Sequence, residues 1–239
     1  MQNLGQTRSA HRANHFLQTP DTFVRAPLPG MTGATAIVHI SPAEGAKFTQ
    51  YTAEFEAGGS LGPTAAQRLV YVLEGSLTAD GELGAGQYVY VPAGTSLPVR
   101  ATARSRAVVI EKPFQPLADV SAPALFRGDE NTIASNPFMG DSDLQVRMLL
   151  PPGPCFDFAM NTMTFQPGAT LPMVEMHVME HGLVMLSGGG IYRLGDDWYP
   201  VTAGDFIWMA PYCPQWFGAL GKSPAKYLLY KDANRHPLP

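Results

Sequence analysis

Apolar and polar positions along this chain alternate over short runs, as in β-strands, and not at the spacing of helices. Residues 87–94 (QYVYVPAG) and 205–212 (DFIWMAPY) are typical, because both are rich in β-branched or aromatic side chains and have a Pro near their end. No long stretch places apolar residues three and four apart. The pattern therefore predicts an all-β protein built from short strands.

The strand pattern occurs twice. A first copy over residues 55–101 and a second over 165–219 share a strand, a Gly, a hairpin, an Ala-Gly turn and an aromatic strand. Gly75 matches Gly188 between the copies. Short strands in this order, repeated, predict two double-stranded β-helix (jelly-roll) barrels in one chain. We expect a metal-free N-terminal barrel with an arm over residues 1–115, and a C-terminal barrel with the active site over 116–239.

Composition narrows the function classes without changing the fold. The 239 residues are 45% hydrophobic, with 24 Gly and 22 Pro, which suits a globular chain with many turns. A net charge of −4 without a basic stripe argues against nucleic-acid binding. Two cysteines make no disulfide framework, and neither a signal peptide nor a membrane span is visible. A cytoplasmic protein without a membrane partner is expected.

The chemistry concentrates in the second copy, in the segment VEMHVMEHG. Glu175 and His177 are two apart and project from one face of a strand. His181 follows a turn, and Gln215 ends the aromatic strand. Two imidazoles, a carboxylate and an amide oxygen form a mixed nitrogen and oxygen donor set that suits Mn²⁺, Fe²⁺ or Zn²⁺. The two oxygen donors and the lack of a thiolate favour Mn²⁺.

The first copy acts as an internal control for this metal site. Alignment on the shared glycine puts other residues at the four ligand positions: Gly62, Thr64, Arg68 and Leu97. None of these can replace the ligands, and an arginine would repel a cation. One metal site per chain is therefore predicted.

Three further side chains can line the same cavity. Tyr192 follows a hairpin turn, while Tyr227 and Lys231 share one face of a late strand. Lys231 either neutralises a substrate carboxylate or ends the strand in solvent. Glu180 alternates to the opposite face and is read as a salt-bridge or solvent residue. The three tryptophans are read as core or pocket wall.

The ligand pattern of Glu-x-His, His four residues on, then Gln differs from the usual cupin set of His-x-His, Glu and His. With the stretch from Phe156 to Arg235, it makes the chain resemble the (S)-ureidoglycine aminohydrolases, which are bicupins also labelled glyoxylate-induced proteins. Weaker likeness covers the first half. The resemblance implies Mn²⁺-dependent hydrolysis of (S)-ureidoglycine to (S)-ureidoglycolate and ammonia in allantoin breakdown, by a homo-oligomer.

The resemblance also implies a role for each candidate residue. The metal ligands would be Glu175, His177, His181 and Gln215. Substrate contacts would come from Glu175, Gln215, Tyr192, Tyr227 and Lys231, with Glu175 and Lys231 as the catalytic pair. An Fe²⁺-dependent bicupin dioxygenase and a metabolite-binding bicupin without catalysis stay open as alternatives.

Overall fold

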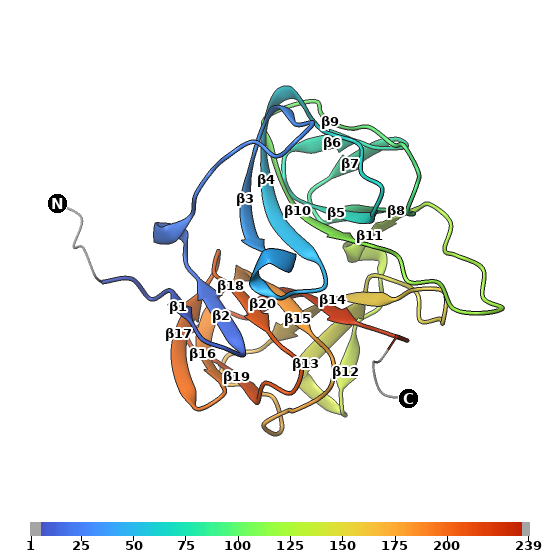
Figure 1. Cartoon of the computed structure of the whole chain (residues 1–239). Coiled ribbons are helices and arrows are strands. Elements are labelled where there is room, and N and C mark those ends of the chain that lie inside the picture. Colours follow the sequence, from blue (N-terminus) through green and yellow to red (C-terminus); the bar gives the residue numbers. More distant parts are fainter. Residues whose placement is uncertain (1–5, 236–239) are drawn as a thin grey trace. The chain divides into compact units, whose positions relative to one another are not determined.

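The computed structural model describes residues 6–235, and their regular structure is almost entirely antiparallel strand, with three short 3₁₀ helices. The all-β prediction is confirmed. The described residues form two compact units (Figure 1). The N-terminal unit comprises residues 24–132, and the C-terminal unit comprises residues 6–23 together with 133–235.

The N-terminal unit holds one nine-stranded sheet. Its strands are β3 (Thr32–Ile40), β4 (Thr49–Leu61), β5 (Gln67–Glu74), β6 (Ser76–Thr78), β7 (Glu82–Gly84), β8 (Gln87–Val91), β9 (Val99–Ala101), β10 (Ser105–Lys112) and β11 (Phe126–Asp129). The sheet order is β11-β8-β5-β10-β4-β9-β6-β7, with β3 beside β4. Alternate residues of β4 point into the core: Tyr51, Ala53 and Phe55 are buried in one apolar cluster with partners from β5, β8 and β10.

His39 of β3 is a buried polar residue of the N-terminal unit. Its Nε2 lies 2.8 Å from the Thr52 hydroxyl. Burial, helped by the nearby charge of Arg106, lowers the pKa of His39 to about 3. The folded protein therefore keeps this imidazole neutral under conditions in which the unfolded chain binds a proton.

Acid should consequently destabilise the protein through His39. Because the folded pKa is depressed, the contribution is present above pH 6.5 and is lost as pH falls towards 3, at about 2 kcal/mol between pH 7 and 5. His39→Gln, which keeps a partner for Thr52, should lose about 2 kcal/mol less over that interval. Urea unfolding at both pH values measures this, with the exposed His11→Gln as control. Equal losses in His39→Gln and wild type would contradict the expectation.

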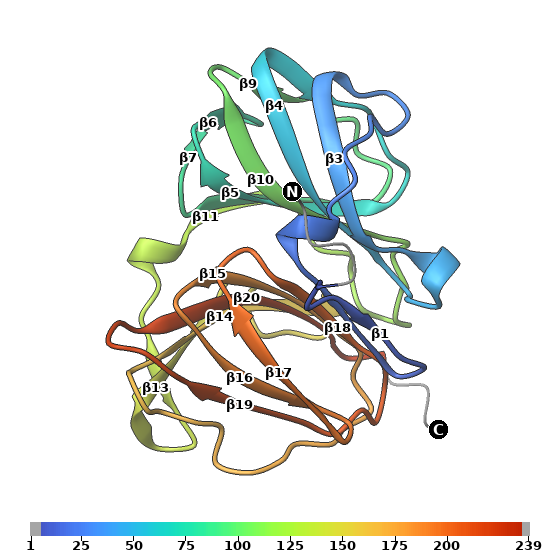
Figure 2. The same cartoon turned by 90° about the vertical axis from the view of Figure 1, so that its left-hand side faces the viewer.

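The C-terminal unit pairs an eight-stranded sheet with a three-stranded one (Figure 2). The first has the order β1 (Ala10–His11), β2 (His15–Gln18), β18 (Phe206–Met209), β15 (His181–Ser187), β20 (Ala225–Asp232), β14 (Phe158–Phe165), β13 (Asp141–Met148), β12 (Asn136–Phe138). The second has the order β17 (Asp197–Thr202), β16 (Gly189–Leu194), β19 (Gln215–Ala219).

The N-terminal arm belongs to the C-terminal unit. Strand β2 pairs with β18, so the arm extends the larger sheet at its edge. The Arg8 guanidinium binds the buried Asp205 carboxylate, with Nη2 2.9 Å from Oδ1. This division differs from the predicted one, which placed the arm with the first barrel and began the second barrel at residue 116. Hydrophobic alternation marks a strand but not the sheet that it joins, which explains the difference.

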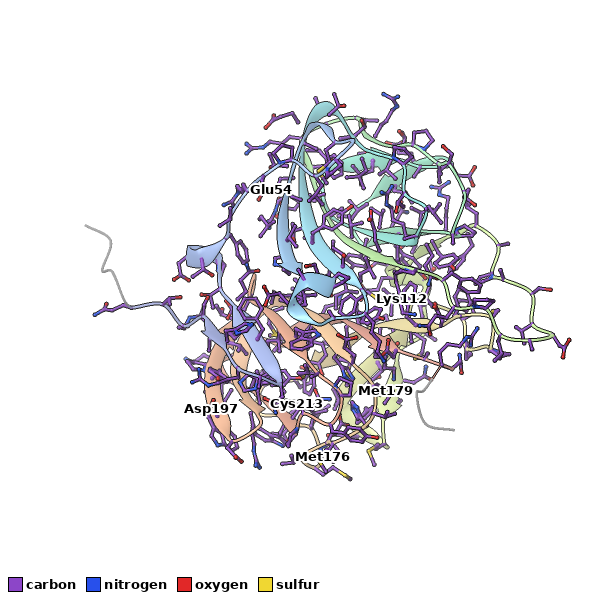
Figure 3. All side chains as sticks on the ribbon, in the orientation of Figure 1. Glu54, Lys112, Met176, Met179, Asp197 and Cys213 are labelled. Carbon is purple, nitrogen blue, oxygen red and sulfur yellow. The ribbon has the colours of Figure 1, made fainter. Side chains whose placement is uncertain are left out.

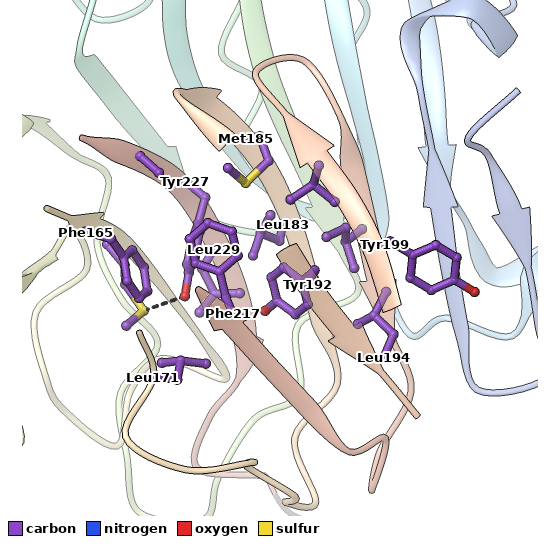
Figure 4. Close-up of a cluster of buried hydrophobic side chains, with 14 of the residues drawn as sticks. Phe165, Leu171, Leu183, Met185, Tyr192, Leu194, Tyr199, Phe217, Tyr227 and Leu229 are labelled. Atoms are coloured by element: carbon purple, nitrogen blue, oxygen red, sulfur yellow. Dashed lines mark hydrogen bonds between the residues drawn. The ribbon is translucent and has the colours of Figure 1, made fainter. Parts of the chain in front are cut away.

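The core of the C-terminal unit lies between its two sheets. Figure 4 shows Leu183 and Leu229 of the larger sheet with Tyr192 and Phe217 of the smaller one in this cluster. Trp198, expected in the core or a pocket wall, is instead 57% exposed, because it stands on the outer face of β17.

Glu180 does not behave as a solvent residue. It is buried, and its carboxylate accepts a hydrogen bond of 2.7 Å from the Trp208 indole nitrogen. Its predicted turn away from the cavity is consistent with this contact, because Glu180 does not line the cavity described below.

The repeat is visible in equivalent turns of the two units. Gly75 and Gly188 both have positive φ, at 81° and 65°, and each stands between two consecutive strands, β5 and β6 or β15 and β16. A Cβ at Gly188 would lie 2.6 Å from the Pro224 carbonyl oxygen. Only glycine fits this conformation and this spacing. Of the helices in residues 6–235, none is long and apolar enough to span a membrane.

Candidate metal centre

A cavity of about 370 Å³ opens in the C-terminal unit, within the usual size range of small-molecule sites. Its walls come from the larger sheet, from strands β16 and β19 of the smaller sheet, and from the loop between β14 and β15. All seven side chains singled out in the sequence line it: Glu175, His177, His181, Tyr192, Gln215, Tyr227 and Lys231. Residues up to 56 positions apart in the chain therefore meet in one place.

The loop between β14 and β15 carries two of the candidate ligands. The sequence predicted a strand at Glu175. In the structure Glu175 instead forms an isolated β-bridge with Gln215. Two backbone hydrogen bonds of 2.8 and 2.9 Å close this bridge. The backbone thus holds the carboxylate and the amide beside each other. Figure 3 labels Met176 and Met179 on the same loop, and Met176 is exposed.

The two imidazoles lie close together with their rings 4.6 Å apart between centroids. His181 Nδ1 lies 3.1 Å from the Met179 carbonyl oxygen, to which it donates, so its Nε2 is left as an acceptor. Burial and the neighbouring His177 and Lys231 lower the pKa of His181 well below its usual value. A neutral imidazole of this kind is the form that binds a metal.

His177 is oriented by Gln215. The Gln215 amide nitrogen lies 3.1 Å from His177 Nε2, which accepts its hydrogen. The Gln215 amide oxygen accepts a hydrogen bond of 3.1 Å from the Tyr192 hydroxyl. His177 Nδ1 is buried and has no hydrogen-bond partner within residues 6–235. Burial and the Glu175 charge raise the pKa of Tyr192, so this phenol remains a donor.

The donor set fits a divalent cation by its chemistry and by its shared cavity. Glu175 Oε2 lies 3.8 Å from His177 Nε2, and both side chains are about one quarter exposed. Among residues 6–235, however, no three His, Cys, Asp or Glu side chains are arranged so that they could hold a metal. Here His177 and Gln215 bond to each other, His181 bonds to the backbone, and the Glu175 carboxylate lies near His177.

Lys231 and Tyr227 face the cavity from β20, as the alternation predicted. Burial lowers the pKa of Lys231, although the Glu175 charge acts against this. The Tyr227 hydroxyl donates to the sulfur of Met163 at 3.2 Å, drawn as a dashed line in Figure 4. Burial, followed by Tyr192 and Glu175, raises the pKa of Tyr227. The cavity therefore offers an amine and a phenol donor opposite the imidazoles.

The equivalent place in the N-terminal unit holds an ion pair. Arg68 pairs with Glu111 across β5 and β10, just as His181 pairs with Lys231 across β15 and β20. Arg68 Nη2 lies 2.6 Å from Glu111 Oε1, and the Tyr51 hydroxyl donates to the same oxygen at 2.9 Å. A guanidinium at the His181 position agrees with the sequence comparison, in which the first copy lacks the ligands.

Two polar residues of the cavity wall, Asn136 and Asn161, were missed from the sequence. Asn161 of β14 lines the cavity and is 3% exposed. Asn161 lies two positions from Met163 on the same face of an otherwise apolar strand, and Met163 also lines the cavity. This alternation could have indicated Asn161 from the sequence. Cys213 is buried, which raises the pKa of its thiol and disfavours the reactive thiolate.

Known proteins resemble the chain over nearly its whole length. The family description of the cupin domain matches residues 161–230. The (S)-ureidoglycine aminohydrolase of Arabidopsis thaliana is 39% identical over 98% of this chain and 80% of its own.

Solved structures also resemble the chain over nearly its whole length. A putative glyoxylate-induced protein from Pseudomonas aeruginosa has a TM-score of 0.88 at 30% identity, covering 99% of this chain and 94% of its own. Oxalate decarboxylase of Bacillus subtilis, at 10% identity, has a TM-score of 0.69 over 96% of this chain and 80% of its own. The second likeness concerns the fold alone and confirms the bicupin architecture.

Proposed function

Because the chain belongs to the (S)-ureidoglycine aminohydrolase family, we propose that it hydrolyses (S)-ureidoglycine to (S)-ureidoglycolate and ammonia. The observation that carries the proposal is the single cavity in which all seven predicted side chains meet. The cavity suits a small substrate that bears both a carboxylate and an amine. It offers a carboxylate, two imidazoles, an amide, two phenols and an amine.

The proposal includes a divalent metal, Mn²⁺, held by Glu175, His177, His181 and Gln215. Support comes from the donor set, from the His181 Nε2 that is left as an acceptor, and from the lack of thiolates in the cavity. When bound, such an ion supplies Lewis acidity to groups that develop negative charge. The N-terminal unit, with Arg68 at the equivalent position, is proposed to bind no metal.

The protein side chains would bind and orient the substrate. Lys231 would pair its ammonium with the substrate carboxylate, and the Tyr227 hydroxyl would exchange its Met163 sulfur acceptor for the same group. Tyr192 holds the Gln215 amide in place. In the reaction the carbon–nitrogen bond to the α-amine breaks and a water oxygen takes its place at the carbon. Glu175, partly exposed, can carry a proton to the departing amine, which leaves as ammonia.

The direct test is ammonia release from freshly generated ureidoglycine by the purified protein, with and without added Mn²⁺. Release that depends on the protein and on the metal is expected, together with Mn²⁺ retained after gel filtration, as measured by elemental analysis. Failure of both ammonia release and metal retention would refute the proposed function.

The setting of the activity is part of the same proposal. A homo-oligomer acting in the cytoplasm on a small molecule, without nucleic acid or membrane partners, is the arrangement that we expect. Light scattering during gel filtration gives the mass in solution, and a monomer would contradict the oligomer.

A further inference from the structure

Asn161 is a buried amide in the cavity wall that the proposed chemistry leaves without a role. It lies on β14, and its Oδ1 is buried without a hydrogen-bond partner within residues 6–235. An unpaired buried acceptor costs free energy, and folded proteins keep few of them. An acceptor that borders a cavity can be satisfied by whatever occupies the cavity.

The sheet register places Asn161 beyond Lys231 as seen from the imidazoles. The strand order is β15-β20-β14, so one strand separates β14 from the strand of His181. Asn161 pairs with Leu229, and Lys231 and Tyr227 stand two positions to either side of Leu229 on the same face. With about 4.8 Å between neighbouring strands, the strand of Asn161 lies roughly 10 Å from that of His181.

In the N-terminal unit, the residue equivalent to Asn161 has a hydrogen-bond partner inside the protein. Tyr51 pairs with Val109, two residues before Glu111, just as Asn161 pairs with Leu229, two residues before Lys231. The Tyr51 hydroxyl is bonded to Glu111. At this register position the N-terminal unit therefore has an internal partner, whereas the Asn161 amide oxygen has none.

We propose that Asn161 is a specificity-determining residue whose Oδ1 accepts a hydrogen bond from the terminal NH₂ of the substrate's ureido group. The inference rests on the proposed function, which sets the leaving amine beside Glu175 and the carboxylate beside Lys231. The ureido group is then the remaining arm of the substrate, and it carries the N–H groups that an unpaired acceptor requires. Its direction away from the imidazoles leads to β14.

Two stable analogues isolate this contact. N-carbamoylglycine and N-acetylglycine share the carboxylate and the amide, but the first ends in NH₂ where the second ends in CH₃. Calorimetry on the Mn²⁺-loaded protein should show wild type binding the carbamoyl compound about tenfold or more tightly, because a built acceptor rejects a ligand that lacks the donor. Asn161→Leu should lower that ratio by about tenfold.

Two more variants separate recognition from a structural role. Asn161→Ala removes the acceptor without adding volume and should also lose the preference for N-carbamoylglycine. It therefore tests the proposal even if Asn161→Leu does not fold. Asn161→Asp keeps an oxygen at this place and should keep the ratio while repelling both carboxylates alike. A purely structural residue would lower both affinities together and leave the ratio unchanged. Without ligand, Asn161→Leu should not lower the unfolding temperature, since it removes an unpaired buried acceptor.

The outcomes distinguish this inference from the proposed function. Equal binding of the two analogues by wild type, or no measurable binding of N-carbamoylglycine, would overturn the role of Asn161. An unchanged ratio in both Asn161→Leu and Asn161→Ala would do the same, and ammonia release by wild type would then leave the function standing. A ratio that depends on Asn161 without any ammonia release would support recognition and reject the reaction.

Discussion

His181→Ala should release the metal from this protein and abolish ammonia production while the fold persists. The imidazole is 3% exposed, is held by the Met179 carbonyl and is kept neutral by its surroundings, so it is the most preorganised of the candidate ligands. Loss of one ligand should weaken Mn²⁺ binding by more than about 100-fold, since changes to outer-sphere partners alone cost 10–100-fold. Elemental analysis after gel filtration and a metal titration measure the effect.

A matched control separates metal loss from unfolding. His11→Ala changes an exposed histidine of the same unit and should keep full Mn²⁺ content. Circular dichroism and thermal unfolding should show that His181→Ala remains folded, because its side chain is replaced by a smaller one at the cavity edge. Full metal occupancy in folded His181→Ala would show that this residue is not a ligand.

Lys231→Met should reduce kcat/KM for ureidoglycine by roughly 10- to 150-fold, the value of a charge-assisted hydrogen bond of about 1.5–3 kcal/mol. The loss should fall mainly on KM, because the substrate carboxylate is present before and during the reaction. The depressed pKa of Lys231 shows that burial disfavours its charge, so the variant should be at least as stable as wild type at neutral pH. Steady-state kinetics and thermal unfolding give the two readouts.

Lys226→Met provides the comparison for Lys231. Lys226 stands on the same strand but on the alternate face, outside the cavity, so its replacement should change kcat/KM less than twofold. If Lys231→Met retained the kinetics of Lys226→Met, the carboxylate would be bound elsewhere.

The sequence was sufficient for features that depend on local alternation and on repetition. The two copies predicted the strands and the equivalence of Gly75 with Gly188, and the parity of positions placed Tyr227 and Lys231 on one face. Ligand spacing and strand alternation indicated seven candidate residues, and all seven line one cavity in the structure. These inferences succeed because a strand fixes side-chain direction residue by residue.

Features that depend on distant pairing were beyond the sequence. The arm joins β18 through backbone hydrogen bonds that leave no side-chain pattern. Glu175 is placed by a bridge to Gln215 and not by a strand of its own. Asn161 became a candidate only when the register showed it between the positions of Tyr227 and Lys231. Trp198 was misplaced because aromatic character alone does not tell the inner face of β17 from the outer one.

The ion pair of the N-terminal unit bears on how this chain can evolve. Arg68 is 5% and Glu111 21% exposed, so replacing either one leaves a largely buried charge without its partner. This loss costs about 3–5 kcal/mol, and the lower figure applies because the pair is partly exposed. A metal site in the N-terminal unit would need Arg68 and Glu111 replaced together, and then ligands at Gly62, Thr64 and Leu97. Each intermediate would be less stable than the present protein. The Arg68–Glu111 ion pair therefore makes the stepwise gain of a metal site in the N-terminal unit costly in stability.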